Sequence, residues 1–122
     1  MDFNKGGFST LRHDVINSPE FNALSGNSAK LLTKLLGQFN GYNNGDLTLL
    51  QNKAAELYGM SNATAKKAID ELLDSGFIIT TRQGGKNRCS LYALTFIAVN
   101  ECDNKIDIQP TRKPLDYWKK PR

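Results

Sequence analysis

Polar and basic side chains cluster directly after a glycine near the middle of the chain, and their types suit contacts to a nucleic acid. The hydroxyls of Ser61 and Thr64 can donate hydrogen bonds to phosphate oxygens. The amide of Asn62 can pair with adenine, and the ammonium group of Lys67 can pair with guanine. We therefore expect a DNA-contacting surface in the stretch that holds Ser61, Asn62, Ala63, Thr64, Lys66 and Lys67.

A second basic set surrounds the dipeptide Gly84-Gly85. Glycine lets a loop approach a sugar-phosphate backbone closely, because it has no side chain to stand between them. Lysine and arginine neutralise the phosphates that such a loop meets. The contacts expected from this loop are Arg82, Lys86, Asn87 and Arg88.

Two helices must position the first set. The first of them is expected to begin at Thr48, with Gln51 three residues later as its partner in a capping box. Gly59 supplies the residue of positive φ that a tight turn between helices requires. Ala55 is the small residue expected where the two helices cross. The apolar stripe of this first helix is expected to be Leu50, Ala54 and Leu57.

The second helix of the pair is expected over residues 61–75, with Ser61 as its N-cap and Gly76 after its end. Apolar residues at helical spacing predict a buried face made of Ala65, Ala68, Ile69, Leu72 and Leu73. We expect the acidic residues of its second half to lie on a solvent face away from the DNA; they are Asp70, Glu71 and Asp74.

Further helices are predicted before this pair. A short one starts with Ser18 as N-cap and Pro19 in the first helical position, where a missing N–H costs nothing. A longer one follows, capped by either Ser25 or Ser28. Its apolar face is predicted to hold Leu31, Leu32, Leu35, Leu36 and Phe39.

Extended segments complete the predicted order of elements. Residues 46–48 read as a single short strand, and residues 77–82 and 90–96 as the two strands of a hairpin that carries the glycine-bearing loop. The chain then divides into an N-terminal arm or short strand at residues 1–17, a domain at residues 18–96, and a basic, proline-containing C-terminal tail at residues 97–122.

The chain resembles the winged helix-turn-helix family over roughly residues 31–96. The order of the elements, the stretch at residues 51–70 and the junction at residues 72–78 carry this resemblance. The resemblance implies a fold that is mainly α with a small β-wing. It also implies that the recognition helix, at about residues 61–75, lies in the major groove. The wing, at residues 82–90, would then touch the DNA backbone or the minor groove.

A finer resemblance concerns residues 43–48 together with Ala54 and Ala55. They are similar to phage- and plasmid-borne members, including the amino-terminal domains of lambda-type replication protein O. Ala65 departs from the family pattern, because many members carry a branched aliphatic residue there. A smaller core contact at that position loosens the helix pair without breaking the pattern.

The expected function is sequence-specific binding of double-stranded DNA by a transcriptional regulator. A homodimer is expected, because two half-sites give more specificity than one small module. Two alternatives stay open: an origin-binding replication protein of a phage or plasmid, and a winged helix that contacts only proteins. Charge alone does not decide between them, because basic and acidic residues nearly balance within residues 46–96.

Composition limits the other classes of function. The chain has 122 residues and a net charge of +4, with a pI of about 9.1, which suits one domain with a polyanionic partner. His13 is the sole histidine, and Cys89 and Cys102 lack the spacing of metal ligands. Both thiols are expected to be free, because two cysteines without a secretion signal are seldom bridged. We expect no enzyme, no catalytic residue, no cofactor and no metal.

The apolar segments of the chain bear on its localisation. The sequence contains no apolar run of membrane-spanning length and no signal-peptide pattern at its start. We expect a cytoplasmic, nucleoid-associated protein of a bacterial or phage-infected cell, without a membrane partner.

The tail carries its own basic set, made of Lys105, Arg112, Lys113, Lys119, Lys120 and Arg122. These side chains either track phosphates or belong to a solvated terminus. Leu115, Tyr117 and Trp118 are expected to anchor the tail to its own domain or to a protein partner.

Overall fold

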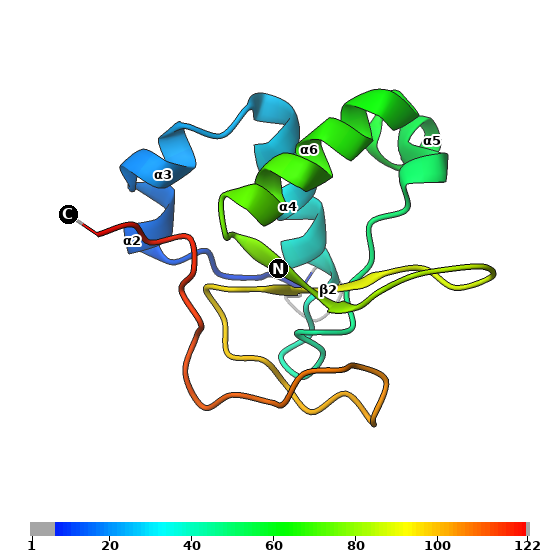
Figure 1. Cartoon of the computed structure of the whole chain (residues 1–122). Helices are drawn as coiled ribbons and strands as arrows, with labels where there is room; N and C mark the ends of the chain where they lie inside the picture. The colour runs from blue at the N-terminus through cyan, green and yellow to red at the C-terminus, as the bar shows by residue number, and fades with distance from the viewer. Residues whose placement is uncertain (1–6, 122) are drawn as a thin grey trace.

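The computed structural model describes residues 7–121 and combines helices with a small two-stranded antiparallel sheet (Figure 1). None of the helices in this part of the chain has both the length and the apolar character needed to span a membrane. The elements, in chain order, are α2 (His13–Ile16), α3 (Pro19–Asn22), α4 (Gly26–Gln38), the 3-10 turn η1 (Gln51–Lys53), α5 (Ala54–Tyr58), α6 (Asn62–Asp74), β1 (Ile78–Arg82) and β2 (Leu91–Leu94).

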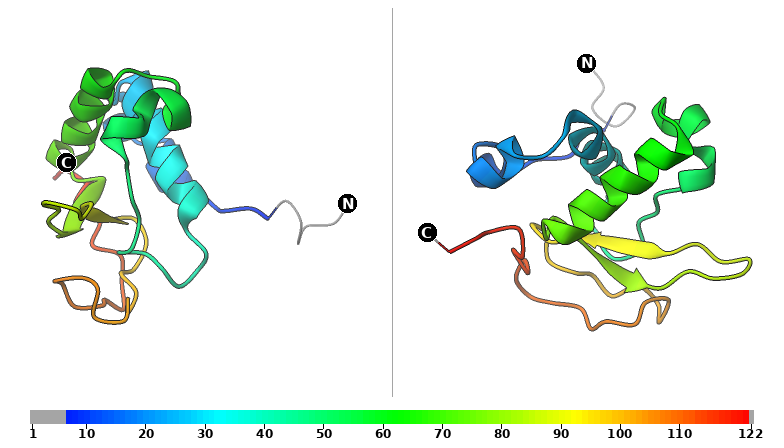
Figure 2. Two further views of the ribbon diagram at one scale, coloured as in Figure 1. Left: turned by 90° about the vertical axis from the view of Figure 1, so that its right-hand side faces the viewer. Right: turned by 45° about the horizontal axis from the view of Figure 1, so that its top comes forward.

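The two long helices, α4 and α6, pack against each other above the β1–β2 hairpin (Figure 1). In the sheet, Ile78 pairs with Leu94 and Thr80 with Tyr92, and a bulge follows Thr80. The loop of the hairpin projects beyond the helices (Figure 2). The core between these layers includes Leu31, Leu35, Ala65, Ala68, Leu72, Phe77 and Leu94.

Local signals set both ends of α6. The Ser61 Oγ accepts a hydrogen bond from the Thr64 N–H at 3.1 Å, so Ser61 is the N-cap, as predicted. Gly59, before the helix, has φ 68°, and Gly76, after it, has φ 80°. Both glycines therefore occupy the left-handed region that side chains disfavour. The predicted buried face is confirmed for Ala65, Ala68, Ile69 and Leu72, and Leu73 is partly buried.

The start of α5 differs from the prediction. Thr48 caps no helix, because the amide side chain of Gln38 binds its backbone: the Thr48 N–H donates to the Gln38 Oε1 at 2.9 Å, and the Gln38 Nε2 donates to the Thr48 carbonyl at 2.7 Å. The predicted capping box with Gln51 is therefore wrong. The chain stays extended to Leu50, and α5 begins at Ala54 after the 3-10 turn.

The buried side of α5 also differs. Ala54, not Ala55, is the small residue packed in the core, and Ala55 is exposed. Leu57 is 43% exposed, whereas Tyr58 is only 6% exposed and takes the core position. The Tyr58 hydroxyl accepts a hydrogen bond from the Leu50 N–H at 3.1 Å, which fixes this orientation.

Among the N-terminal elements, the predicted alternative of a short strand is wrong and two predicted caps are confirmed. Residues 1–6 of the predicted arm lie outside the described part of the chain, and His13–Ile16 form a helical turn, not a strand, with Val15 buried. Ser18 caps α3 with Pro19 in its first position, as expected. Ser25, and not Ser28, caps α4.

The C-terminal segment returns under the sheet and ends near α2 and α3 (Figures 1 and 2). Trp118 is 1% exposed and forms part of the core, whereas Tyr117 is 60% exposed. Asp116 accepts hydrogen bonds from the Trp118 Nε1 at 3.0 Å and from the Arg12 guanidinium at 2.8 Å. Trp118 is therefore the main anchor of this segment, with Leu115 half-buried beside it.

Candidate nucleic-acid interface

The N-terminal turn of α6 presents fewer free hydroxyl groups than the sequence predicted. The Ser61 hydroxyl is already occupied, because its Oγ accepts from the Thr64 N–H and donates to the Thr64 Oγ1 at 2.9 Å. Thr64 accepts that bond, so its own proton remains available to another acceptor. Asn62 and Ala63 are exposed beside it.

The two lysines of α6 lie on different sides of the helix. Lys66 faces the hairpin, and its ammonium group forms an ion pair with the Asp70 carboxylate at 2.9 Å, one helical turn along. Lys67 lines a second hollow, together with Ser25 and Asn27 and with the acidic residues Asp70, Glu71 and Asp74. The sequence predicted that Asp70 lies away from the DNA-contacting surface, and this prediction is wrong. The Asp70 carboxylate instead neutralises the charge of Lys66, one of the cations of that surface.

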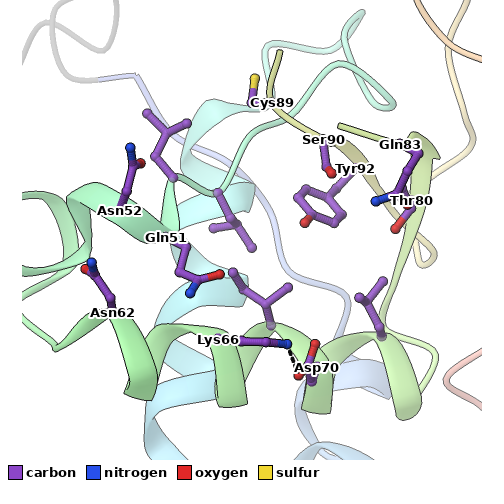
Figure 3. Close-up of a pocket in the computed structure, with 14 residues that line it drawn as sticks. Gln51, Asn52, Asn62, Lys66, Asp70, Thr80, Gln83, Cys89, Ser90 and Tyr92 are labelled. Atoms are coloured by element: carbon purple, nitrogen blue, oxygen red, sulfur yellow. Dashed lines mark hydrogen bonds and ion pairs between the residues drawn. The ribbon is translucent and has the colours of Figure 1, made fainter. Parts of the chain in front are cut away.

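A cleft of about 500 Å³ separates α6 from the hairpin (Figure 3). Asn62 and Lys66 line it from α6, and Thr80 and Gln83 line it from the hairpin. Its polar lining includes four residues that were not predicted from the sequence: Gln51, Asn52, Gln83 and Ser90. The first two stand at the start of the turn that leads into α5, which is the position a helix-turn-helix pattern could have indicated.

The hairpin tip is a tight turn with exposed side chains. Gly85 and Arg88 exchange backbone hydrogen bonds, and Asn87 adopts φ 61° between them, a conformation that asparagine tolerates better than most residues. Lys86 and Asn87 therefore project at the tip. Gly84 is closely packed, because a Cβ there would lie 2.6 Å from the Ser90 nitrogen.

The two arginines of the hairpin are partly tied to its own backbone. An Arg82 guanidinium nitrogen donates to the Cys89 carbonyl at 2.9 Å, and an Arg88 guanidinium nitrogen donates to the Gln83 carbonyl at 3.4 Å. Arg82 is half-buried and Arg88 is exposed. Arg88 and Lys86 are thus the cations of the hairpin that are best placed to meet an external anion.

Tyr92 closes the inner wall of the cleft. Its side chain is largely buried, and this burial raises the pKa of the Tyr92 hydroxyl above its usual value. The hydroxyl therefore stays protonated at neutral pH and can donate a hydrogen bond. Cys89 is a free, exposed thiol at the same cleft, and Cys102 is free and buried elsewhere. Within residues 7–121, no group of side chains is arranged to hold a metal ion.

Glu71 fixes α6 to the N-terminus of α4. Its carboxylate accepts hydrogen bonds from the Ser25 N–H, from the Ser25 hydroxyl at 2.7 Å and from the Ser28 hydroxyl. These bonds, first those of the Ser28 and Ser25 hydroxyls, lower the pKa of the Glu71 carboxyl group. Glu71 was expected on a solvent face, but it is half-buried and positions the helix that carries Lys67.

The tail contributes one cation near this surface. Lys120 lines the same hollow as Lys67, which has a volume of about 740 Å³. Lys105 lies elsewhere and pairs with Asp46 at 3.3 Å. Lys119 and Lys120 lie together, and Arg122 falls outside the described residues.

Comparison with known proteins gives no relatives: no protein-family model, no curated protein and no solved structure matches the chain.

Proposed function

We propose that the protein binds double-stranded DNA as a winged helix-turn-helix, with α6 as the recognition helix and the β1–β2 hairpin as the wing. One observation carries this proposal. The N-terminal end of α6, the short helix α5 and the tip of the hairpin all lie at the same end of the molecule (Figures 1 and 2). Asn62 and Lys66 of α6 also share a cleft with the hairpin. A single duplex can therefore meet helix and hairpin together.

The order of the elements supports the same proposal. α4 is followed by Leu47, whose N–H and carbonyl each bond to the backbone of Tyr92 in β2, at 3.2 and 2.8 Å. α5, α6 and the hairpin follow in turn. This is the order of helix, short strand, two helices and hairpin that the sequence patterns predicted.

The dimensions of α6 suit the major groove. Its 13 residues span about 20 Å, and the groove is wide enough to admit an α-helix. In the proposed mode, Asn62 and Lys67 reach base edges, and Thr64 donates to a phosphate. Lys86, Asn87 and Arg88 of the hairpin follow the backbone. Ser61 acts through the helix that it caps.

Asp70 gives the interface a chemical preference. A carboxylate is repelled by phosphate but accepts a hydrogen bond from the N4 amino group of cytosine. Its partner Lys66 offers the donor that the guanine N7 and O6 atoms accept. The Lys66–Asp70 pair therefore complements a G·C base pair, and it disfavours indiscriminate contact with the DNA backbone.

A protein-only role is the second candidate, and a specific observation favours it. Asp70 and Asp74 are exposed on α6, and Asp70 already neutralises Lys66, so the helix surface is not strongly basic. A basic protein partner suits such a face better than DNA does. The two candidates differ in whether purified protein binds any duplex.

Fluorescence anisotropy with labelled duplexes tests the proposal. One duplex comes from the region upstream of the coding sequence, one from a candidate replication origin, and one is scrambled. Binding to a particular duplex that weakens steeply as salt rises supports the proposal. Preference for the upstream or the origin duplex separates a regulator from a replication protein. An absence of binding at low salt refutes DNA binding and favours the protein-only role.

The proposed assembly on DNA is a homodimer that reads two half-sites. Sedimentation of the protein with a palindromic duplex and with a single half-site measures the stoichiometry. Two chains on the palindrome and one on the half-site are expected.

A further inference from the structure

A second groove lies between α4 and α5, on the other side of Leu50 from the cleft beside α6. It has a volume of about 660 Å³. Its lining comes from α4, from the extended segment before η1 and from α5, and consists of Lys30, Thr33, Lys34, Gly37, Gln38, Thr48, Leu50, Leu57 and Tyr58.

Hydrogen bonds hold the walls of this groove in place. Gln38 at the end of α4 makes two bonds to the backbone of Thr48, of 2.7 and 2.9 Å. The Tyr58 hydroxyl accepts from the Leu50 N–H at 3.1 Å. Because α4, the extended segment and α5 are tied together by these bonds, little ordering of the groove is needed when a ligand binds.

The floor of the groove is apolar and open. Leu57 exposes 43% of its surface there, because the neighbouring Tyr58 occupies the core position of α5. Gly37 adds no side chain, and a Cβ built at that position has no neighbour within 4 Å. An aliphatic side chain from another molecule can therefore enter beside Leu57 and Leu50.

The rim of the groove is positive. Lys30 and Lys34 are exposed one helical turn apart on α4, and neither forms an ion pair with another residue of the described chain. None of the lining residues is acidic. An apolar floor beneath two unpaired cations is complementary to an acidic, amphipathic peptide.

We propose that this groove docks an acidic amphipathic helix of a partner protein. An aliphatic residue of that helix packs on Leu57 and Leu50, and its carboxylates face Lys30 and Lys34. The apolar floor favours a peptide over a DNA backbone, because phosphates gain nothing from exposed leucine. This proposal is independent of DNA binding, since the groove residues are not those proposed to contact the duplex.

The test uses a fluorescent synthetic helical peptide with leucine along one face and glutamate along the other. Two matched peptides replace its leucines with serine or its glutamates with lysine. The full-length protein is expected to bind only the first peptide. The double variant Lys30→Glu/Lys34→Glu and the variant Leu57→Ser are each expected to weaken that binding by about tenfold. Lys113→Glu, a charge reversal on the exposed tail, is the control and is expected to bind as the wild type does.

Four results would overturn the proposal. The first is that the acidic peptide fails to bind the wild-type protein, although circular dichroism shows that this protein is folded. The second is that the serine peptide binds as tightly as the leucine peptide, which would show that charge alone causes the binding. The third is displacement of the peptide by duplex DNA with loss of DNA affinity in Lys30→Glu/Lys34→Glu, which would assign the groove to DNA. The fourth is self-association of the protein that Leu57→Ser abolishes, which would make a second copy the occupant.

Discussion

The indole ring of Trp118 stacks on the ring of Phe77, with ring centroids 5.8 Å apart and planes inclined by 9°. Phe77 directly precedes β1 in the link from α6, and Trp118 lies near the end of the described chain. The C-terminal segment thus supports the junction between the proposed recognition helix and the proposed wing. The backbone joins in this packing, because a Cβ at Gly76 would lie 2.4 Å from the Tyr117 carbonyl oxygen.

Replacement of this indole tests whether the tail belongs to the fold. Trp118→Ala is expected to lower the free energy of unfolding by about 3–5 kcal/mol, because it leaves a cavity beside Phe77. Chemical denaturation followed by circular dichroism measures the loss. Tyr117→Ala is the matched control, since that neighbouring side chain is mostly exposed. Equal stability of the two variants would show that the tail is dispensable.

Glu71 makes stability depend on acid. Its folded pKa is lowered by the Ser28 and Ser25 hydroxyls, so its contribution is present above the ordinary pKa of glutamate. That contribution is lost as the pH falls through the lowered folded pKa. Glu71→Gln is expected to cost about 1–3 kcal/mol at neutral pH, because the amide accepts weaker hydrogen bonds. Denaturation across a pH series should show the gap between wild type and variant closing in acid; a constant gap would contradict this role.

The ion pair on α6 predicts an asymmetry between its lysines. Lys67→Ala is expected to cost about 1–3 kcal/mol of DNA-binding free energy and to relax preference at one base pair. Lys66→Ala should instead lower the affinity for every duplex, because it leaves the Asp70 carboxylate without its cation at the interface. Asp70→Asn should tighten binding to an A·T duplex by about two- to fivefold, since it removes a negative charge from the interface. It should tighten binding to a G·C duplex less, because the amide is a weaker acceptor for the cytosine amino group than the carboxylate is.

Anisotropy titrations of these three variants against matched G·C and A·T duplexes measure both affinity and preference. Loss of the G·C preference in Asp70→Asn supports the proposed reading of that base pair. Weaker binding of the A·T duplex by Asp70→Asn would contradict the repulsion between Asp70 and phosphate on which the prediction rests.

The hairpin tip should contribute affinity without sequence preference. Lys86→Ala is expected to weaken binding to all duplexes alike and to reduce the dependence of log K on log salt by about 1, because one phosphate contact is lost. Lys113→Ala in the tail serves as the control for net charge. A Lys86→Ala effect confined to one sequence would argue against a backbone contact.

Local signals allowed much of this fold to be predicted from sequence. Ser61 can cap a helix and Gly59 can adopt positive φ regardless of the rest of the protein, so both were identified. The alternation of apolar residues likewise indicated the hairpin. These features depend only on residues that are close in the sequence, so the sequence pattern predicts them directly.

The errors arise where a side chain from a neighbouring element decides the conformation of the segment. Thr48 has the chemistry of a cap, but the side chain of Gln38 binds its backbone and keeps it extended. Tyr58 takes the core position in place of Leu57, because the Tyr58 hydroxyl accepts a hydrogen bond from the Leu50 N–H. Neither partner can be inferred from periodicity.

The candidate site shows the same division. The residues of the α6 N-terminus and of the hairpin were predicted from their types. The Lys66–Asp70 pair is local in sequence, at i and i+4, and could have been anticipated from helical spacing. The opposing wall of the cleft, with Gln51 and Ser90, depends on how the hairpin packs against the helices.

Titration of isotope-labelled protein with duplex DNA, followed by amide chemical shifts in NMR spectra, tests the central claim most directly. The account predicts that the largest shifts fall on Asn62, Lys67 and Lys86, with smaller ones along the cleft between α6 and the hairpin. Shifts confined to the groove between α4 and α5, or no shifts at all at low salt, would contradict DNA recognition by α6 and the hairpin.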